Sequence, residues 1–341
     1  MRPDGGNSCR NPERTPQVDC HVHLWGLGDS DSGIWIDRRY RFSLNFLGNG
    51  LLLGMHRRKR AGLSYDAYYL KVLLESLRSS PIDLAVVQGM EGVYGAGGEL
   101  LRDRMAIHIP NEYIYRVCAA NPELRPAAAI SPARPDWEAQ LELAAENDAL
   151  YVKVNPCVGG TDPGDRKWLP FYRRMKDLDL KLCCHTGPER ALPGSRPEFA
   201  DPARLELPLS EGLTVIAAHA GTDTWMDSLP YFDNMNRLME RHEGLYADTS
   251  AVAQVFRWKW VERVGAGQLV RSRLLHGSDF PVPVTTLPWG VLGLQSWWRI
   301  RGMGSAFARD LAVKDVAGYG RESAERAARV LGIASPVDPD G

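Results

Sequence analysis

Residues 17–23 read Gln-Val-Asp-Cys-His-Val-His, a short run in which apolar and polar side chains alternate. Such alternation predicts a β-strand, because successive side chains of a strand point to opposite faces. One face then carries the polar members of the run, Asp19, His21 and His23. Three polar groups on an inward face are costly to bury without partners, so the run indicates a strand that carries a site rather than a solvated terminal strand.

Seven further runs rich in Val, Ile, Leu and Ala follow along the chain. They span residues 82–88, 124–130, 150–155, 180–185, 213–219, 244–249 and 273–279. Stretches with helical periodicity separate them, at residues 65–78, 112–120, 137–146, 169–178, 231–241 and 254–263, with a last helix near 321–331. This alternation predicts an α/β fold, and eight strands predict closure into a (β/α)8 TIM barrel. Pro197, Pro202 and Pro208 interrupt the region after the fifth run, so the helix that should lie there has the weakest support in the sequence.

Two long insertions follow the first and second runs, at residues 24–63 and 89–110. Loops that follow the strands of such a barrel lie at its carboxyl-terminal face, where active sites are built. The insertions are therefore candidate lids. Residues 1–16, rich in Pro, Gly, Asn and charge, are expected to form a flexible tail before a single domain over residues 17–335.

The composition is that of an ordinary globular protein. Among 341 residues, 41 Lys and Arg balance 42 Asp and Glu to a formal net charge of −1, so we expect a small-molecule partner rather than nucleic acid or membrane. No apolar run approaches the ~20 residues that span a bilayer. The six cysteines form no C-x-x-C pair and are expected to be reduced, in a cytoplasmic protein for which a homodimer is a candidate state.

Three later strands end in a residue that can bind a metal or carry a proton. The fifth run ends at His185, the sixth at His219 and the eighth at Asp279. A single histidine at such a place is more often a hydrogen-bonded structural residue. Together with His21 and His23, however, these side chains make a set of nitrogen and oxygen donors suited to a divalent cation.

At these positions the chain resembles the amidohydrolase-related proteins of the amidohydrolase superfamily. That family includes aminocarboxymuconate-semialdehyde decarboxylase, resorcylate decarboxylases and lactone hydrolases. The resemblance rests on five motifs in order: VDCHVH at 18–23, YVKVNP at 151–156, CCHTG at 183–187, AAHAG at 217–221 and HGSDFP at 276–281. It implies that the metal ligands are His21, His23, His185 and Asp279. His219 would then be a catalytic acid/base or an additional ligand.

This ligand set predicts one divalent ion, with zinc favoured and manganese, iron or cobalt as alternatives. A cation held by three imidazoles and one carboxylate can keep a position for a water molecule and lower its pKa, and Asp279 could accept the proton of that water. Lys153 leaves two interpretations open. In two-metal members of the superfamily a lysine of the fourth strand is carbamylated and bridges the ions, whereas here Lys153 could equally hold a substrate carboxylate.

Several neighbours of these residues are expected to support the site or the substrate. The group comprises Asp19, Asn155, Thr186, Glu189, Arg190 and Thr249, with Arg257 as a further cation and Gln88 and Glu91 as residues that could line the pocket. We expect Asp19 to orient the site rather than to bind the metal. His276 has the opposite strand parity to Asp279, so it should face the helices. The basic run at residues 56–60 is expected to be a solvated charge cluster.

Two enzymatic functions fit these residues. The favoured one is hydrolysis of a small amide, ester or lactone by a metal-activated water. The alternative is non-oxidative decarboxylation of an aromatic or unsaturated carboxylic acid, which needs a cation such as Lys153, Arg190 or Arg257 to grip the carboxylate. A barrel that has lost activity and serves as a binding protein is a third, remote alternative, because every type of ligand is retained.

Overall fold

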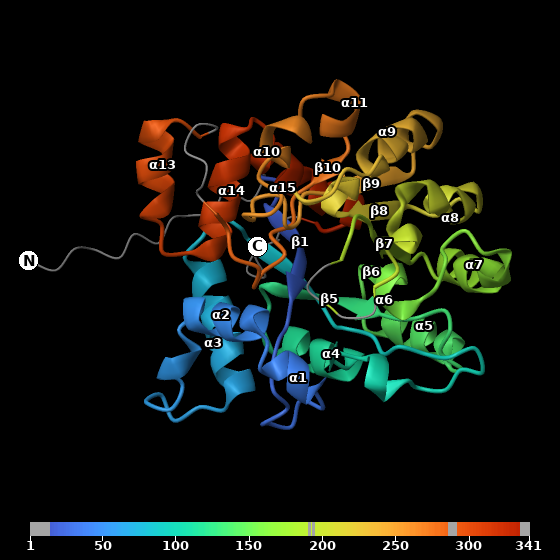
Figure 1. Cartoon of the computed structure of the whole chain (residues 1–341), viewed down its shortest axis with the longest axis horizontal. Coiled ribbons are helices and arrows are strands. Elements are labelled where there is room, and N and C mark those ends of the chain that lie inside the picture. Colours follow the sequence, from blue (N-terminus) through green and yellow to red (C-terminus); the bar gives the residue numbers. More distant parts are fainter. Residues whose placement is uncertain (1–13, 190–191, 193–194, 286–291, 335–341) are drawn as a thin grey trace, which may run out of the picture.

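The computed structural model describes residues 14–189, 192, 195–285 and 292–334 (Figure 1). Eight strands in this part of the chain form one parallel sheet, and their order in the sheet is their order in the sequence. They are β1 (Val18–His23), β3 (Leu84–Gln88), β5 (Leu124–Ala129), β6 (Tyr151–Val154), β7 (Lys181–His185), β8 (Val215–Ala218), β9 (Leu245–Asp248) and β10 (Leu274–Leu275). Each overlaps one of the eight expected runs, which confirms the (β/α)8 barrel.

Backbone hydrogen bonds between β1 and the segment after β10 close the barrel. Val22 and Phe280 form a parallel bridge. The amide of His23 donates to the carbonyl of Phe280 at 2.8 Å, and the amide of Asp279 donates to the carbonyl of His21 at 2.9 Å. The first and last strand ends are therefore held side by side, although more than 250 residues separate them in the sequence.

Helices surround the strands (Figure 1). The longer ones are α2 (Leu44–Leu52), α3 (Tyr65–Arg78), α4 (Asn111–Ala120), α5 (Trp137–Glu146), α7 (Leu169–Asp177), α9 (Tyr231–Arg241), α13 (Leu294–Arg301), α14 (Ala306–Val316) and α15 (Gly320–Leu331). Short ones are α1 (Arg38–Arg41), α6 (Pro156–Gly159), α8 (Glu206–Ser210), α10 (Trp260–Arg263) and α11 (Gln268–Arg271). Single 3-10 turns are η1 (Met55–Arg57), η2 (Arg102–Arg104), η3 (Arg166–Trp168), η4 (Pro197–Ala200), η5 (Pro202–Leu205) and η6 (His219–Gly221).

The expected helix at residues 254–263 is wrong over most of its length. Only α10 is helical, and the residues before it form turns. Ala251 has a left-handed φ of +58°, and the carbonyl of Phe256 accepts a bond from the amide of Trp225 at 2.9 Å. Because this carbonyl bonds across to another loop instead of along a helix, the segment is held at the barrel mouth. The proline-rich region after β7 forms η4, η5 and the short helix α8, so the weakly supported helix is present only as these short pieces.

The two insertions join each other above the strand ends. Strand β2 (Trp35–Ile36) of the first insertion pairs antiparallel with β4 (Ile107–His108) of the second. A further antiparallel bridge links Met90 to Ile109. The first insertion also holds α1, α2 and η1, which pack next to one another beside α3 (Figure 1). The insertions thus form one cover rather than two separate loops.

Apolar side chains fill the lower part of the barrel. This buried cluster contains Val18, Cys20, Leu84, Val86, Ala127, Tyr151, Cys183, Ile216, Ala218 and Leu275 from the strands. Helix α15 adds Ala327, Ala328 and Leu331 to the same cluster. The barrel is therefore packed below the strand ends, and polar groups are left to gather above.

The expected tail over residues 1–16 is described only from Arg14, and its first thirteen residues lie outside the described part of the chain. Arg14 Nη2 donates to both carboxylate oxygens of Asp83, at 2.8 and 2.6 Å. The chain is thus held against the barrel from Arg14 onward. Among the described helices, none combines the length and the apolar character that crossing a membrane requires.

Candidate active site

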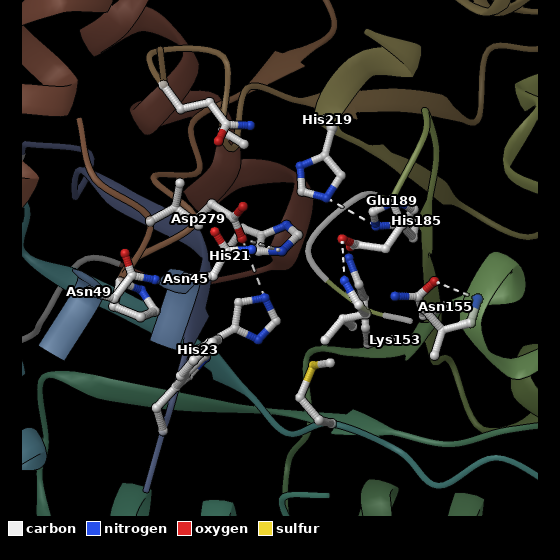
Figure 2. A pocket seen from close by; sticks show the side chains of 18 of the residues that line it. His21, His23, Asn45, Asn49, Lys153, Asn155, His185, Glu189, His219 and Asp279 are labelled. Atoms are coloured by element: carbon white, nitrogen blue, oxygen red, sulfur yellow. Dashed lines mark hydrogen bonds and ion pairs between the residues drawn. The ribbon is translucent and has the colours of Figure 1, made fainter. Parts of the chain in front are cut away.

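A cavity of about 830 Å³ opens at the carboxyl ends of the strands. Strand ends contribute most of its titratable side chains: His21, His23, Lys153, His185, His219 and Asp279. Both insertions line it as well, which agrees with their expected position at the active-site face. Figure 2 shows His21, His23 and Asp279 on one side of the cavity and Lys153, Asn155, His185 and Glu189 on the other.

Asp279 lies between the two histidines of β1. Its Oδ1 atom is 3.4 Å from Nε2 of His21 and 3.3 Å from Nε2 of His23. These three residues can offer ligand atoms that all lie within 4.8 Å of one another. The Nε2 atom of His21 is buried and has no hydrogen-bond partner among the described residues. Two nitrogens and one oxygen therefore converge as they would around a small cation.

Two residues of the site have strained backbones. Asp279 has φ +64° and His219 has φ +63°, in the left-handed region that side chains other than glycine rarely adopt. Each such conformation costs ~1–3 kcal/mol and persists only where the surrounding structure enforces it. Here the strain turns both side chains from the strand direction toward the cavity that they line.

Asp248, the last residue of β9, fixes the tautomer of His21. Its Oδ2 atom is 2.7 Å from Nδ1 of His21, and both side chains are fully buried. Although burial acts to raise the pKa of Asp248, the charge and hydrogen bond of His21 hold that pKa below its ordinary value. An ionised carboxylate can only accept, so Nδ1 of His21 carries the proton and Nε2 presents its lone pair to the cavity.

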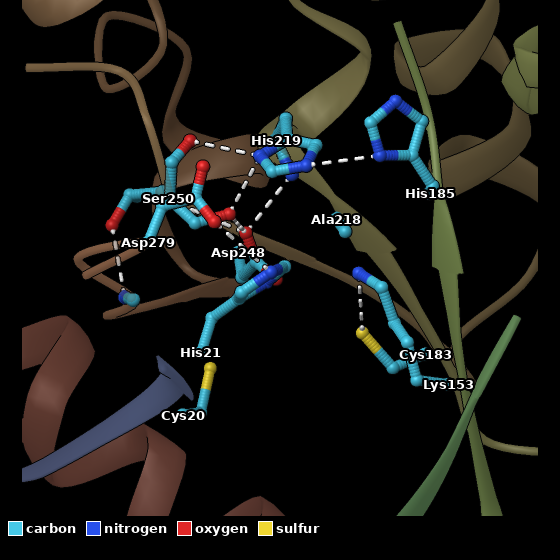
Figure 3. Close-up of polar contacts among 12 residues, drawn as sticks. Cys20, His21, Lys153, Cys183, His185, Ala218, His219, Asp248, Ser250 and Asp279 are labelled. Atoms are coloured by element: carbon cyan, nitrogen blue, oxygen red, sulfur yellow. Dashed lines mark hydrogen bonds and ion pairs between the residues drawn. The ribbon is translucent and has the colours of Figure 1, made fainter. Parts of the chain in front are cut away.

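The same carboxylate orients two more histidines through Ser250 (Figure 3). The hydroxyl of Ser250 donates to Oδ1 of Asp248 and lies 2.8 Å from Nδ1 of His219, which must then be the donor. Nε2 of His219 in turn lies 3.1 Å from Nδ1 of His185 and accepts a hydrogen bond from it. Nε2 of His185 is left unprotonated, buried and without a hydrogen-bond partner in the described chain. One carboxylate thereby leaves lone pairs on both His21 and His185.

The electrostatics of the site favour these protonation states. Burial lowers the pKa of His185 well below its ordinary value, and Lys153 adds to the effect. Burial also lowers the pKa of His219 well below its ordinary value, with His185 next in importance. For Asp279, burial acts to raise the pKa, but the hydrogen bond of His23 and the charges of His21, His23 and Lys153 hold it below the ordinary value. Neutral imidazoles beside an ionised carboxylate are the forms that bind a metal.

The role of Asp248 is missing from the expectations, although the sequence holds a signal for it. Within β9, Leu245 and Ala247 belong to the core outside the barrel, so the alternating residues Tyr246 and Asp248 face inward. Strict alternation of inward and outward side chains along the seventh run would have selected Asp248 instead of Thr249. Ser250, beyond the strand, follows no such pattern.

Comparison with protein families identifies the family of the chain. The model of an amidohydrolase family matches residues 18–296, which is most of the chain. The chain belongs to the amidohydrolase family. Comparison of this amidohydrolase with curated proteins finds no match.

Solved structures share the fold of this amidohydrolase. An uncharacterized TIM-barrel protein of Bordetella bronchiseptica is 16% identical, with a TM-score of 0.55 over 92% of this chain and 99% of its own. IDCase of Metarhizium anisopliae, in apo form, is 15% identical, with a TM-score of 0.55 over 94% and 98%. The 5-carboxyvanillate decarboxylase of Sphingomonas paucimobilis is 14% identical, with a TM-score of 0.52 over 94% and 100%. At these identities the likeness shows the fold alone.

Of the four expected ligands, the structure brings His21, His23 and Asp279 together, while His185 lies outside this group of three. His185 is joined to it through His219, whose ring centroid is 4.7 Å from that of His185 and 5.1 Å from that of His21. Its role as a fourth ligand stays a prediction of the amidohydrolase resemblance. Cys183 offers its thiol to a second group with His21 and Asp248, and burial raises the pKa of this thiol to about 12.

The expected inward position of Asp19 is wrong, because β1 contains an irregularity. The pairing of β1 with β3 shifts register between Asp19 and Val22, which is the mark of a β-bulge. Asp19 therefore faces the helix side, 3.8 Å from Nε2 of His276. Its Oδ1 atom accepts bonds from the amides of His21 at 3.1 Å and Ser278 at 3.0 Å. Asp19 thus holds together the backbones of β1 and of the segment that follows β10, and it does not line the cavity.

Lys153 and Arg257 are buried cations at the cavity wall. Lys153 Nζ lies 3.7 Å from Sγ of Cys183. Arg257 donates to the hydroxyl of Thr222 at 3.3 Å and to the carbonyl of Pro188 at 3.2 Å, while its Nε is buried without a hydrogen-bond partner in the described chain. Neither cation has a carboxylate within 4 Å among the described residues, although the charges of Glu189 and Asp279 act on Arg257 against the burial that lowers its pKa. Both cations stand where a negatively charged ligand could reach them.

The two threonines expected at the site have their side chains elsewhere. The hydroxyl of Thr186 donates to the carbonyl of Ala218 and accepts from the amide of Gly221 at 2.9 Å, so it ties together the backbone on both sides of His219. The hydroxyl of Thr249 accepts from the amide of Gly277 at 3.4 Å. Neither threonine lines the cavity, so of the two expected roles, support of the site or of the substrate, the observed bonds fit the first.

Other expected neighbours do reach the cavity. Asn155 lines it while its side chain caps α6 by accepting from the amide of Val158 at 3.4 Å. Glu189 lines it and accepts from the amide of Leu192 at 3.3 Å. Arg190 lies outside the described residues, so its expected role as a substrate cation stays a prediction.

Strands β3 and β6 also supply groups around His23. Gln88 Nε2 lies 3.1 Å from Nε2 of His23, and the hydroxyl of Tyr151 donates to Oε1 of Gln88 at 3.1 Å. Glu91 lines the cavity and forms an ion pair with Arg134 at 2.9 Å. These contacts fix the side of the cavity that β1 and β3 share.

Proposed function

We propose that this amidohydrolase is a metal-dependent hydrolase that uses an activated water to cleave a small amide, ester or lactone. The observation that carries the proposal is the position of Asp279, whose Oδ1 lies 3.4 and 3.3 Å from the Nε2 atoms of His21 and His23. The three groups stand at the wall of a cavity of about 830 Å³, which is large enough for a small substrate and water.

The residues fit a divalent cation. The Nε2 atoms of His21 and His185 are buried and without partners among the described residues, a costly arrangement unless a cation takes their lone pairs. Asp248 supports Nδ1 of His21 from behind, which is the usual second partner of a metal-binding histidine. Imidazole and carboxylate donors favour zinc, with manganese, iron or cobalt as alternatives. When bound, such an ion polarises a substrate carbonyl and lowers the pKa of a coordinated water.

The side chains of the chain itself would move the protons. Asp279 is ionised and reaches into the cavity, so its carboxylate can accept the proton of the attacking water. His219 also lines the cavity, and its Nδ1 rests against Ser250, which donates to Asp248. The proton that Asp279 takes from the water would pass to Nε2 of His219 once the hydrogen bond from Nδ1 of His185 is released, and the buried carboxylate of Asp248 would stabilise it there. From His219 it would reach the leaving nitrogen or oxygen as the bond between that atom and the carbonyl carbon breaks.

The cations of the cavity support a substrate that carries a carboxylate. Lys153 and Arg257 stand at its wall without a carboxylate partner in the described part of the chain. A substrate anion would satisfy the Nε of Arg257, which is otherwise buried without a bond. The position of Lys153 at the cavity wall therefore favours an anion-binding role over that of a carbamylated bridge between two ions.

The same two cations support decarboxylation as a second candidate function. An enzyme that removes a carboxyl group must hold it, and Arg257 offers a planar group that can bind it with two bonds. The fold neighbours include the 5-carboxyvanillate decarboxylase. The ligand set serves either reaction, so the substrate decides between them.

A substrate screen tests the proposal. The zinc-loaded and manganese-loaded protein is incubated with lactones, esters and amides, and in parallel with aromatic carboxylic acids under carbon dioxide detection. We expect hydrolysis, fastest for substrates with a carboxylate. Release of carbon dioxide without any hydrolysis would instead establish the second candidate. Asp279→Asn serves as the matched negative control in both assays.

A further inference from the structure

The first insertion presents an apolar surface to solvent. Five of its side chains are more than half exposed: Phe42, Leu44, Leu47, Leu51 and Leu52. Four of these lie in α2, at spacings of three, four and one residues that place them along one side of the helix. Leu44 is the extreme case, with 89% of its surface exposed. We call residues 38–63 the α2 surface.

The opposite side of α2 is anchored, so the exposed leucines belong to a fixed helix. Phe46 is buried and stacks on Trp25 and Tyr65, each with a ring-centroid distance of 5.8 Å. Its ring also meets that of Tyr40 edge-on at 6.1 Å. The side chain of Ser43 caps the helix by accepting from the amide of Phe46 at 3.2 Å. The exposed leucines therefore lie on a helix whose other side is firmly packed against the protein.

Positive charge borders this face at both ends. Seven cationic residues flank α2: Arg38, Arg39, Arg41, Arg57, Arg58, Lys59 and Arg60. The sequence has no Asp or Glu between Asp37 and Asp66. In the described structure none of the seven forms a salt bridge, and six of them are exposed. The whole chain is balanced in charge, but the α2 surface is strongly basic.

A second copy of the chain is a poor cover for such a surface. In a twofold dimer the same patch meets itself, so two sets of seven positive charges would come together. Like charges brought together in this way oppose association. A surface that offers both an apolar layer and negative charge matches both features, and an anionic lipid bilayer has this composition.

We propose that the α2 surface docks this protein on anionic membranes, with the leucines of α2 in the lipid boundary and the flanking Lys and Arg on lipid phosphates. The net charge of −1 leads to the expectation of no membrane partner. That number sums the charges of the whole chain and does not show that basic residues gather at the α2 surface. Docking of this kind needs no membrane-spanning helix. It also does not depend on the proposed hydrolytic function.

The position of α2 gives the docking a consequence for the site. Leu44, Asn45, Gly48, Asn49 and Leu52 line the cavity, and Figure 2 shows Asn45 and Asn49 on the same side as Asp279. A docked α2 would therefore place the mouth of the cavity at the bilayer surface. Substrates that partition into lipid would reach the cavity past this helix.

Vesicle sedimentation with the full-length protein tests the proposal. We expect binding to vesicles of phosphatidylcholine mixed with phosphatidylglycerol, little binding to phosphatidylcholine alone, and weakening by salt. The double variant Leu47→Asn/Leu51→Asn changes two leucines that do not line the cavity, and it should weaken binding by at least about tenfold. Replacing Arg57, Lys59 and Arg60 by Gln should weaken it by about fivefold per charge.

Leu143→Asn, at an exposed position of α5, is the matched control and should bind as the parent does. Absence of sedimentation with the anionic vesicles at low salt would overturn the proposal, as would binding that the double variant leaves unchanged. Analytical ultracentrifugation adds a second outcome that overturns it: a dimeric parent and a monomeric double variant would show that a second copy covers the α2 surface.

Discussion

Two buried clusters of charge lie on opposite sides of β1. The inner cluster, formed by His21, His23, Asp248 and Asp279, borders the cavity. The outer cluster, formed by Asp19, His276, Asp310 and Lys314, lies between the barrel and α14. Both clusters contain histidines and carboxylates within 4 Å of one another, so residue type and burial do not distinguish them.

What distinguishes the clusters is access and charge balance. In the outer cluster, Lys314 is fully buried, pairs with Asp310 and donates to the carbonyl of Gly277 at 2.7 Å. Both ring nitrogens of His276 lack hydrogen bonds among the described residues, as Nε2 of His21 does, but Nε2 of His276 faces Asp310 and Asp19 instead of a cavity. As the strand parity predicts, His276 lies on the helix side. The outer cluster can stabilise the barrel, whereas the inner one can also meet a ligand.

Asp279→Asn should have the largest effect, confined to the inner cluster. We expect turnover to fall by roughly 10³-fold or more, because the amide can neither accept the proton of a water nor serve as an anionic ligand. Steady-state kinetics on the best substrate of the screen measures the loss, and thermal unfolding checks the fold. A variant that keeps near-parental turnover would remove Asp279 from the mechanism.

Lys314→Met should have the largest effect on stability through the outer cluster. Removal of the cation leaves Asp310 buried without its partner, so we expect a loss of about 3–5 kcal/mol in the free energy of unfolding. Metal content per folded molecule should stay unchanged. Urea unfolding measures the first quantity and elemental analysis the second. The double variant Lys314→Met/Asp310→Asn is the control, and it should recover part of the loss.

Asp248→Asn should affect metal binding more than stability. An asparagine amide can donate to Nδ1 of His21, which would move the ring proton to Nε2 and remove the lone pair from the cavity. We expect metal affinity to fall about 10–100-fold, measured by competition with a chelator. Thr249→Val, at the next residue, is the matched control with unchanged affinity. Equal affinity in the parent and Asp248→Asn would show that His21 does not depend on Asp248.

The pH dependence of stability should reveal the outer cluster with a smaller effect. Burial raises the pKa of Asp310 to about 6, against an ordinary value of 3.8, although Lys314 acts to lower it. The folded state then binds this proton more tightly than the unfolded state, so its contribution to stability grows as pH falls from above 6 toward 4. The parent should gain about 1 kcal/mol relative to Asp310→Asn between about pH 7 and pH 5. Parallel curves for the two proteins would contradict the raised pKa.

The comparison also shows what the sequence can predict. Eight apolar runs and their spacing suffice to predict the barrel. The positions of His21, His23 and Asp279 at strand ends suffice to predict that these residues belong to the site. Asp19 is misplaced because a β-bulge reverses the parity of β1, and nothing in a local pattern marks an extra residue that only pairing with β3 reveals. Ser250 and the turns before α10 depend on contacts between loops, which a single sequence does not encode locally.

Metal content tests the central claim most directly. The full-length parent, loaded with zinc and dialysed, should hold about one divalent ion per chain, as measured by elemental analysis. His21→Gln/His23→Gln should lose that ion, while His276→Gln, a change in the outer cluster, should keep it. A parent that holds no ion after loading, or a double variant that holds as much as the parent, would contradict the assignment of the inner cluster as a metal site.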